Sequence, residues 1–182
     1  MQFPKPYADA VARLRVPSGF LIVIVFAVLS HPTAGSLAIG LPVSVLGLGL
    51  RAWAAGSLAK NQRLATGGPY AYARNPLYVG TLLVAAGLVM ACRSLALGAL
   101  FAAVFLFVYL PVIELEEQHL RRLFPEYAAY AAEVPALWPR LTPFPQENLN
   151  PFRIGLYLTN KEYQAGVGFI AGMLFLLWKM LG

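Results

Sequence analysis

The chain has 182 residues, 59% of them hydrophobic and only 12% charged, and its formal net charge is +6. This composition excludes an ordinary water-soluble domain and indicates an integral membrane protein. The basic residues lie at the ends of apolar runs and form no stripe with interleaved aromatic residues, so the charge does not indicate nucleic-acid binding. A single cysteine excludes an internal disulfide, and two histidines far apart in sequence do not indicate a metal site.

Five apolar runs are expected to cross the membrane. They cover residues 17–30, 37–58, 76–91, 95–110 and 165–181, and turns rich in glycine, proline or charged residues separate them. We therefore predict an all-α integral membrane protein, in which a bundle of about five transmembrane helices forms a single domain over residues 1–182. The break at residues 31–35 favours a helical hairpin between the first two spans.

The second of these runs carries four glycines, at positions 40, 47, 49 and 56. Small residues allow close helix approach where lipid supplies no hydrophobic drive, so this run is expected to present a packed face. Arg51 lies inside the same run. A charged residue at this depth is either a functional candidate or a side chain that reaches back to the membrane surface.

Polar, aromatic and helix-breaking residues gather between the second and third runs, in the stretch Thr66–Gly80. Gly67, Gly68 and Pro69 cannot continue a helix, and Asn75 stands before a proline, which disfavours helical backbone. Pro76 suits the first turn of the helix that follows. We expect a structured loop here, and it is either a chemical site or an interfacial anchor.

An acidic segment follows Pro111, which is expected to kink or reset its helix. Its spacing predicts an amphipathic helix with Leu120, Leu123 and Phe124 on the apolar side. Glu116 and Glu117 are adjacent, and successive helical residues are about 100° apart, so one should face the bundle and the other water. The inward carboxylate needs a cationic partner. Alternatively, these acids only complement the helix dipole, which would give the same pattern of residues.

The charge distribution predicts the topology. With five spans and a cytoplasmic N-terminus, eleven basic residues share the cytoplasmic side, two lie opposite and Arg51 lies within a helix. The Thr66–Gly80 loop and the acidic segment then share the cytoplasmic side, with the amphipathic helix at the membrane surface.

The loop and the acidic segment together resemble a known family. The first motif reads Gly68-Pro69-Tyr70-x-Tyr72-x-Arg74-Asn75-Pro76-Leu77-Tyr78-Val79-Gly80, and the second reads Glu116-Glu117-x-x-Leu120-x-x-x-Phe124-Pro125-Glu126-Tyr127-x-x-Tyr130-x-x-x-Val134-Pro135. This pair resembles the isoprenylcysteine carboxyl methyltransferases, and related phospholipid N-methyltransferases share much of it. The resemblance covers about residues 41–144, so the last apolar run is an extra C-terminal transmembrane helix.

The resemblance implies a membrane-embedded transferase that uses S-adenosylmethionine, with no metal. Its motifs place the cofactor contacts at Gln62, Arg63, Leu64, Ala65, Tyr70, Asn75, Pro76, Leu77, Tyr78 and Glu116. The expected catalytic residues are Arg74, Tyr78 and Glu117. Prenylcysteine enzymes usually have histidine in place of Asn75, and they have an arginine for the substrate carboxylate where this chain has Val112. Arg74 or Arg51 would have to replace that arginine.

Three functions follow from this interpretation. The first is carboxyl O-methylation of an isoprenylcysteine-type, lipid-like acceptor that enters from the bilayer; a carboxylate is already deprotonated at neutral pH and needs no base. The second is N-methylation of an ethanolamine phospholipid, which would need a proton acceptor such as Glu114 or Glu117. The third, from another class, is a non-enzymatic membrane scaffold or partner-binding protein.

Overall fold

A computed structural model describes residues 5–145 and 151–182, and every regular element in these ranges is helical. The all-α prediction is therefore confirmed. The elements are α1 (Lys5–Leu29), α2 (Ala34–Ser57), the 3-10 helix η1 (Gly68–Ala71), α3 (Pro76–Cys92), α4 (Leu95–Val104), the π-helix η2 (Phe105–Tyr109), α5 (Leu110–Leu123), α6 (Tyr127–Glu133), α7 (Ile154–Thr159) and α8 (Tyr163–Leu181).

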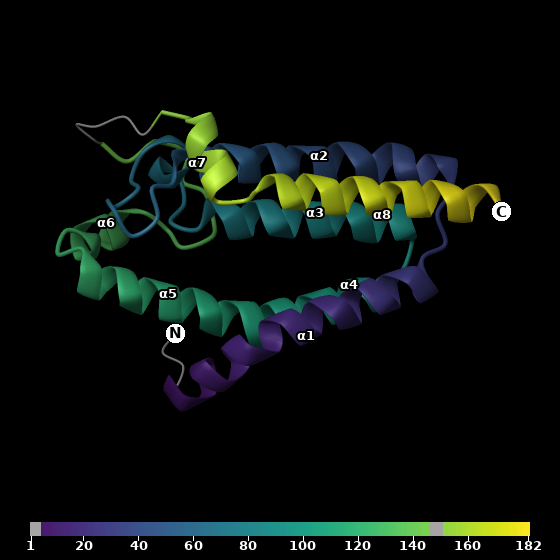
Figure 1. The fold of residues 1–182 in the computed structure, drawn as a ribbon, viewed down its shortest axis with the longest axis horizontal. Helices are drawn as coiled ribbons and strands as arrows, with labels where there is room; N and C mark the ends of the chain where they lie inside the picture. The colour runs from purple at the N-terminus through teal and green to yellow at the C-terminus, as the bar shows by residue number, and fades with distance from the viewer. Residues whose placement is uncertain (1–4, 146–150) are drawn as a thin grey trace.

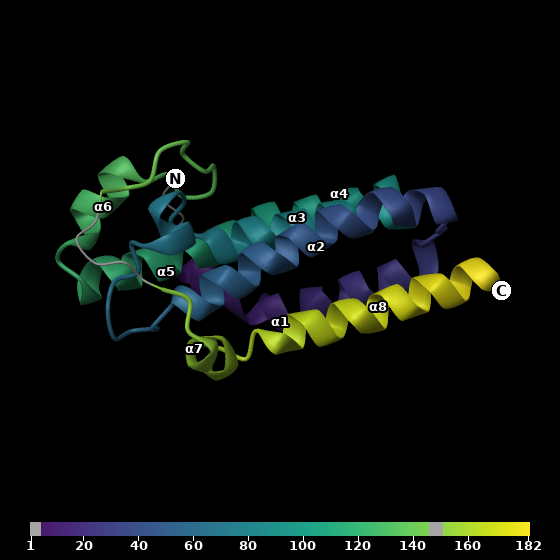
Figure 2. The ribbon, with the colours of Figure 1, turned by 90° about the horizontal axis from the view of Figure 1, so that it is seen from above.

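The long helices form two layers (Figure 1). One layer holds α2, α3 and α8, and the other holds α1, α4 and α5. The short helices α6 and α7, with the loop after α2, gather at the end of the molecule opposite the C-terminus. Seen from above, α2 and α3 cross the middle of the molecule side by side (Figure 2).

Three helices of the described chain are long and apolar enough to cross a membrane: Ala34–Ser57, Leu95–Leu123 and Tyr163–Leu181. The other two predicted spans correspond to shorter apolar helices, Val16–Leu29 and Pro76–Cys92. The second of these has 17 residues, which gives about 26 Å at a rise of about 1.5 Å per residue, a little less than the hydrocarbon thickness. By length and composition, then, three of the five predicted spans are confirmed.

Pro111 does not end the helix that carries it. The chain runs from α4 through the π-helix η2 directly into α5, so the amphipathic segment continues a membrane-length helix. Proline has no N–H to donate to the carbonyl four residues earlier. That carbonyl, on Phe107, instead accepts a hydrogen bond from the Tyr7 hydroxyl at 3.0 Å. The predicted disturbance at Pro111 thus takes the form of a π-turn in a continuous helix.

The small-residue face predicted for the second run is confirmed. Gly40 and Gly47 of α2 lie against Gly80 and Gly87 of α3, and a methyl group built on Gly47 would stand 2.7 Å from the Gly80 carbonyl oxygen. Ser44 adds a hydrogen bond across this interface, from its hydroxyl to the Val84 carbonyl at 3.1 Å. The backbones of α2 and α3 therefore touch directly, as helices do in membranes.

The predicted hairpin between the first two helices is wrong. The break lies at residues 30–33, and Thr33 caps α2 by accepting a hydrogen bond from the Ser36 amide. However, α1 packs against α4, η2 and α5, whereas α2 packs chiefly against α3. The glycine face of α2 is already occupied by α3, which explains why α1 joins the other layer.

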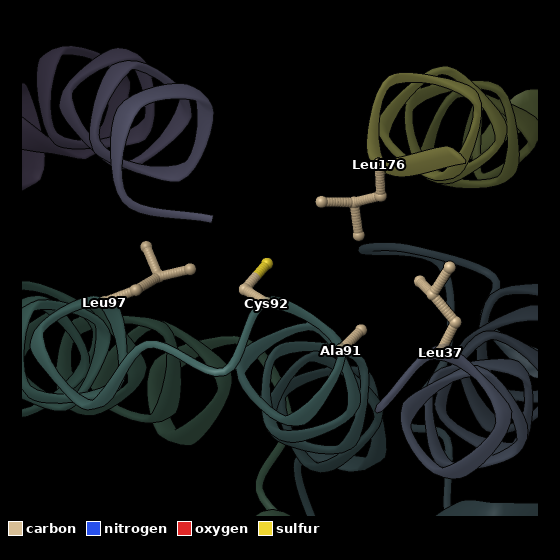
Figure 3. Packing of buried hydrophobic residues seen from close by; sticks show 5 residues of the cluster. All are labelled: Leu37, Ala91, Cys92, Leu97 and Leu176. Atoms are coloured by element: carbon tan, nitrogen blue, oxygen red, sulfur yellow. The ribbon is translucent and has the colours of Figure 1, made fainter. Parts of the chain in front are cut away.

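The end of the bundle away from the short helices is held by an apolar cluster from four helices. Figure 3 shows its buried members, Leu37, Ala91, Cys92, Leu97 and Leu176. Leu176 is the one buried residue of α8. At the same end, the Lys179 ammonium donates to the Ala27 carbonyl at 2.9 Å and the Val28 carbonyl at 3.2 Å. Cys92 is buried, in agreement with a packing role.

We predict that Gly47→Val lowers stability by about 1 to 3 kcal/mol or more, because the new side chain would overlap backbone atoms of α3 that cannot move aside. Gly49→Val is the matched control on the same helix, since nothing lies within 4 Å of a side chain there. Thermal unfolding in detergent would show a clear loss for the first variant and little change for the second. Equal behaviour of the two would contradict the packing described here.

Candidate functional site

The stretch between α2 and α3 is a structured loop, as predicted. Gly68 has a φ of 58°, in the left-handed region that favours glycine, and it opens the short helix η1 with Pro69 in its first turn. Asn75 has non-helical backbone angles and precedes α3, which begins at Pro76. Proline at this position loses no hydrogen bond, because the first N–H groups of a helix have no partner within it.

The irregular chain after α6 binds to this loop through its backbone. Four hydrogen bonds of 2.9 to 3.1 Å join the two segments: Arg74 N–H to Pro135 O, Asn75 N–H to Ala136 O, Arg140 N–H to Tyr72 O, and Phe144 N–H to Ala71 O. The proline-rich segment accepts two of these bonds through its carbonyls and donates the other two from the amides of Arg140 and Phe144. Trp138 is 85% exposed, as a membrane-surface anchor would be.

An ion pair connects the loop to α5. The Arg74 guanidinium meets the Glu117 carboxylate in a two-pronged contact, with Nε–Oε1 and Nη2–Oε2 both at 3.0 Å. Its remaining nitrogen, Nη1, donates to the Ala131 and Val134 carbonyls at 2.7 and 2.9 Å. The Asn75 amide also donates to Glu117, at 3.0 Å. Both ionic side chains are mostly buried, and together they join the loop, α5 and α6.

Glu116 and Glu117 face different surroundings, so the prediction for this pair is confirmed. Glu117 faces inward and has the cationic partner that burial requires. Glu116 is more exposed, and its carboxylate accepts a hydrogen bond from the Tyr78 hydroxyl at 3.1 Å. Glu116 forms no salt bridge within the described part of the chain.

Three tyrosines connect η1 with α6. The Tyr130 hydroxyl donates to the Tyr70 carbonyl at 2.7 Å, and Tyr127 packs edge-on against Tyr130. The Tyr70 hydroxyl itself is buried and has no hydrogen-bond partner in the described part of the chain. Burial raises the pKa of this hydroxyl well above its usual range, and the carboxylates of Glu116 and Glu162 raise it further. Tyr70 thus keeps its proton and offers an unused donor.

A cavity of about 930 Å³ lies between these elements. The two predicted motifs both contribute to it, and ten residues with a predicted role line it: Arg63, Leu64, Ala65, Tyr70, Arg74, Asn75, Pro76, Leu77, Tyr78 and Glu116. Two predicted residues do not line it. Gln62 lies in an exposed turn next to Asn61, whose φ is 59°, and Glu117 is turned toward Arg74.

The C-terminal part of the chain also lines the cavity, which the sequence did not indicate. Glu162 pairs with Arg51, with Nε–Oε1 at 2.6 Å and Nη2–Oε2 at 3.0 Å. The third nitrogen of Arg51 donates to the Thr81 hydroxyl and to the Leu77 carbonyl. Arg51 therefore has a buried partner rather than a path to the membrane surface. The one available signal was Arg51 itself, because a charge inside a span calls for a counter-charge.

The remaining charges of the cavity are unevenly distributed. Lys60, Arg63 and Lys161 line it and form no salt bridge within residues 5–145 and 151–182. Lys161 and Asn61, which both line the cavity, have positive φ, of 55° and 59°. The cavity thus offers one carboxylate free of a salt bridge, Glu116, three free cations and an unused phenol donor.

A family model described as "Phospholipid methyltransferase" matches residues 35–127. These residues include α2, the loop, α3 and the acidic part of α5. No solved structure matches the chain significantly.

Two curated relatives are similar to this chain. One is the cobalt-zinc-cadmium resistance protein CzcN of Cupriavidus metallidurans, 42% identical over 108 residues, which are 56% of this chain and 50% of the relative. The other is the nickel-cobalt-cadmium resistance protein NccN of Alcaligenes xylosoxydans xylosoxydans, 38% identical over 101 residues, which are 56% of this chain and 47% of the relative. The chain spans about half the length of these relatives.

Glu117→Gln should destabilise the protein by about 3 to 5 kcal/mol, because it leaves the mostly buried Arg74 without its counter-charge. Glu133→Gln is the matched control: Glu133 lies 3.9 Å from Arg140, but 57% of its side chain is exposed, so its loss should change stability little. Thermal unfolding of both variants in detergent provides the comparison. A Glu117→Gln protein as stable as its control would contradict the role given to this ion pair.

Proposed function

The chain belongs to the phospholipid methyltransferase family, and from this premise we propose that it is a membrane methyltransferase that uses S-adenosylmethionine and a lipid-like acceptor. The observation that carries the proposal is the single cavity bordered by both motifs, with Glu116 on one side and the loop from Arg63 to Tyr78 on the other. By charge distribution, this cavity opens toward the cytoplasm, and the N-terminus lies on the same side.

The residues of the cavity fit the proposed cofactor. Glu116 is free of a salt bridge and can accept hydrogen bonds from an ammonium group, such as that of the methionine part. The buried Tyr70 hydroxyl lacks a hydrogen-bond partner among the residues that the structure describes, and it can donate to the ligand. The volume of about 930 Å³ lies within the usual range of small-molecule sites. When bound, S-adenosylmethionine supplies a methyl group on a positively charged sulfur.

The protein's contribution to such a reaction is mainly alignment and exclusion of water. The Tyr78 hydroxyl holds the Glu116 carboxylate in one orientation. Arg74 and Glu117 hold the loop against α5, and Asn75 is fixed by the same carboxylate. In this proposal Arg74 and Glu117 act by positioning the cavity wall, while Glu116 and Tyr78 act at the ligand. The predicted catalytic roles of Arg74, Tyr78 and Glu117 stay predictions.

Among the predicted acceptors, the geometry favours an amine headgroup over a prenylcysteine carboxylate. Prenylcysteine enzymes have an arginine for the substrate carboxylate where this chain has Val112. Arg74 and Arg51, the two possible replacements, are both fully engaged by protein carboxylates and carbonyls. Neither is available to a substrate. We therefore propose an ethanolamine-type lipid amine as the acceptor.

An amine must lose a proton before it can attack a methyl group. Neither Glu114 nor Glu117, the residues suggested by the sequence for this step, lines the cavity. The carboxylates that do line it are Glu116 and Glu162. Because both oxygens of Glu162 are held by Arg51, the proposal assigns the proton to Glu116.

The names of the curated relatives connect them with metal resistance. For this chain, a role in metal resistance is a proposal. Within residues 5–145 and 151–182 no group of three or more His, Cys, Asp or Glu side chains gathers that could hold a metal ion. We propose that any such role would act through methylation of a membrane component.

Calorimetry with S-adenosylhomocysteine tests the cofactor site. Purified protein in detergent should bind it, and Glu116→Gln should weaken binding by about 10-fold or more, because a hydrogen bond to a charged group contributes about 1.5 to 3 kcal/mol. Glu114→Gln is the matched control on the same helix, outside the cavity. The proposal fails if the unaltered protein binds neither this product nor S-adenosylmethionine.

Tyr70→Phe should separate binding from stability. Because the Tyr70 hydroxyl has no hydrogen-bond partner within residues 5–145 and 151–182, its removal should leave thermal stability unchanged or slightly raised. Cofactor affinity should fall by about 3- to 10-fold, the value of one hydrogen bond. A variant that lost stability but bound the cofactor normally would show that the hydroxyl serves the fold instead.

The acceptor class can be read from the methylated product. Membranes that contain the protein are incubated with S-adenosylmethionine labelled in its methyl group, and the labelled lipid is treated with mild base. We expect label that survives, as methylamines do; base-labile label would identify a carboxyl methyl ester. Membranes with Glu116→Gln protein provide the background, and equal labelling from both would support a non-enzymatic scaffold.

A further inference from the structure

The C-terminal segment from Phe152 to Ala165 lies beyond residues 35–127, the part that matches the family. Nevertheless it supplies Asn160, Lys161, Glu162, Gln164 and Ala165 to the lining of the cavity. In Figure 1 the start of α8 and the helix α5 belong to different layers. The C-terminal residues therefore line the cavity from another side than Glu116 does.

Burial does not explain why α8 stands where it does. Leu176 is its one buried residue, and large apolar side chains such as Val167, Ile170 and Leu174 are about 60% exposed. Inside a membrane, an apolar surface gains no hydrophobic free energy when it moves from lipid to a protein contact. Packing and polar contacts therefore determine the position of a helix. The polar contacts of α8 lie at its two ends, with Lys179 at one and Glu162 at the other.

The segment before α8 is fastened to the end of α2. The Asn160 amide donates to the Ala55 and Leu58 carbonyls at 2.8 and 2.9 Å, at the end of α2, where carbonyls run short of N–H donors from the helix itself. The Arg153 N–H donates to the Gly56 carbonyl at 2.8 Å, and the Phe152 ring fills the space that a side chain at position 56 would occupy.

Glu162 completes this attachment with a charge. Its carboxylate holds Arg51 of α2 through two hydrogen bonds, and the same guanidinium reaches α3 through Thr81 and Leu77. One ion pair thus joins α2, α3 and the start of α8. Both side chains are mostly buried, with 23% and 10% exposure.

We propose that the segment from Phe152 to Ala165 is a wall of the methyltransferase cavity, and that Glu162 is a positioning residue that holds this wall through Arg51. The wall borders the space left for the acceptor, because the proposed cofactor contacts lie on the loop, α3 and α5. This inference rests on the proposed function. It predicts that loosening the wall weakens use of the acceptor much more than binding of the cofactor.

The kinetic test uses Glu162→Gln and Arg51→Gln, with the charge swap Arg51→Glu/Glu162→Arg. Each single variant should raise the KM for the lipid acceptor by about 10-fold while the Kd for S-adenosylhomocysteine changes little, and the swap should restore a large part of the loss. Lys179→Gln is the matched control, because it removes the anchor at the other end of α8. If its effect on the acceptor KM equals that of Glu162→Gln, the proposal is overturned.

A second test needs no methyl transfer. In a Cys92→Ser background, Ala55→Cys places a thiol at a buried cavity position, on the residue whose carbonyl accepts a hydrogen bond from Asn160. A water-soluble maleimide should label it slowly, and adding Glu162→Gln should speed labelling by about 10-fold as the wall loosens. An unchanged labelling rate would contradict the proposal that this segment is a wall of the cavity. Faster labelling in a protein that binds no cofactor would support the wall and contradict the proposed function.

Discussion

The ion pair between Arg74 and Glu117 is the contact on which the cavity depends. It joins the loop after α2 to α5, and the two carbonyls that complete the arginine's hydrogen bonds belong to α6 and the residue after it. A mostly buried charge pair is costly unless every donor and acceptor is satisfied. Here each guanidinium nitrogen has a partner, so the pair holds three segments in one arrangement. The neighbouring Glu116 takes no part in this ion pair and is available to a ligand.

A second arginine is used in the same way. Arg51 is occupied by Glu162, Thr81 and Leu77, as Arg74 is by Glu117 and its carbonyls. The two arginines that could have replaced the one missing at Val112 are therefore part of the scaffold. What remains for a ligand is the Glu116 carboxylate, the Tyr70 hydroxyl and the cations at Lys60, Arg63 and Lys161. This set suits a ligand with a positively charged group beside a negative one, such as an amino acid moiety or a zwitterionic lipid headgroup.

The sequence allowed prediction of the features that depend on local chemistry or on spacing. The glycines of α2, the proline at the start of α3 and the different orientations of Glu116 and Glu117 were of this kind. The contacts of the C-terminal segment could not be foreseen. Glu162 is 111 residues from Arg51, and a lone acid before an apolar run indicates nothing about its partner. The π-helix before Pro111 was not predicted. A proline inside a helix indicates that the helix is disturbed, but it does not indicate which form the disturbance takes.

A structure of the protein in lipid nanodiscs with S-adenosylhomocysteine tests the central claim most directly. The account predicts the ligand in the cavity between the loop and α5, with its ammonium group within hydrogen-bonding distance of Glu116 and the Tyr70 hydroxyl donating to it. The ion pairs of Arg74 and Arg51 should remain intact. A ligand bound elsewhere, or one that displaced Glu117 or Glu162 from its arginine, would contradict the account.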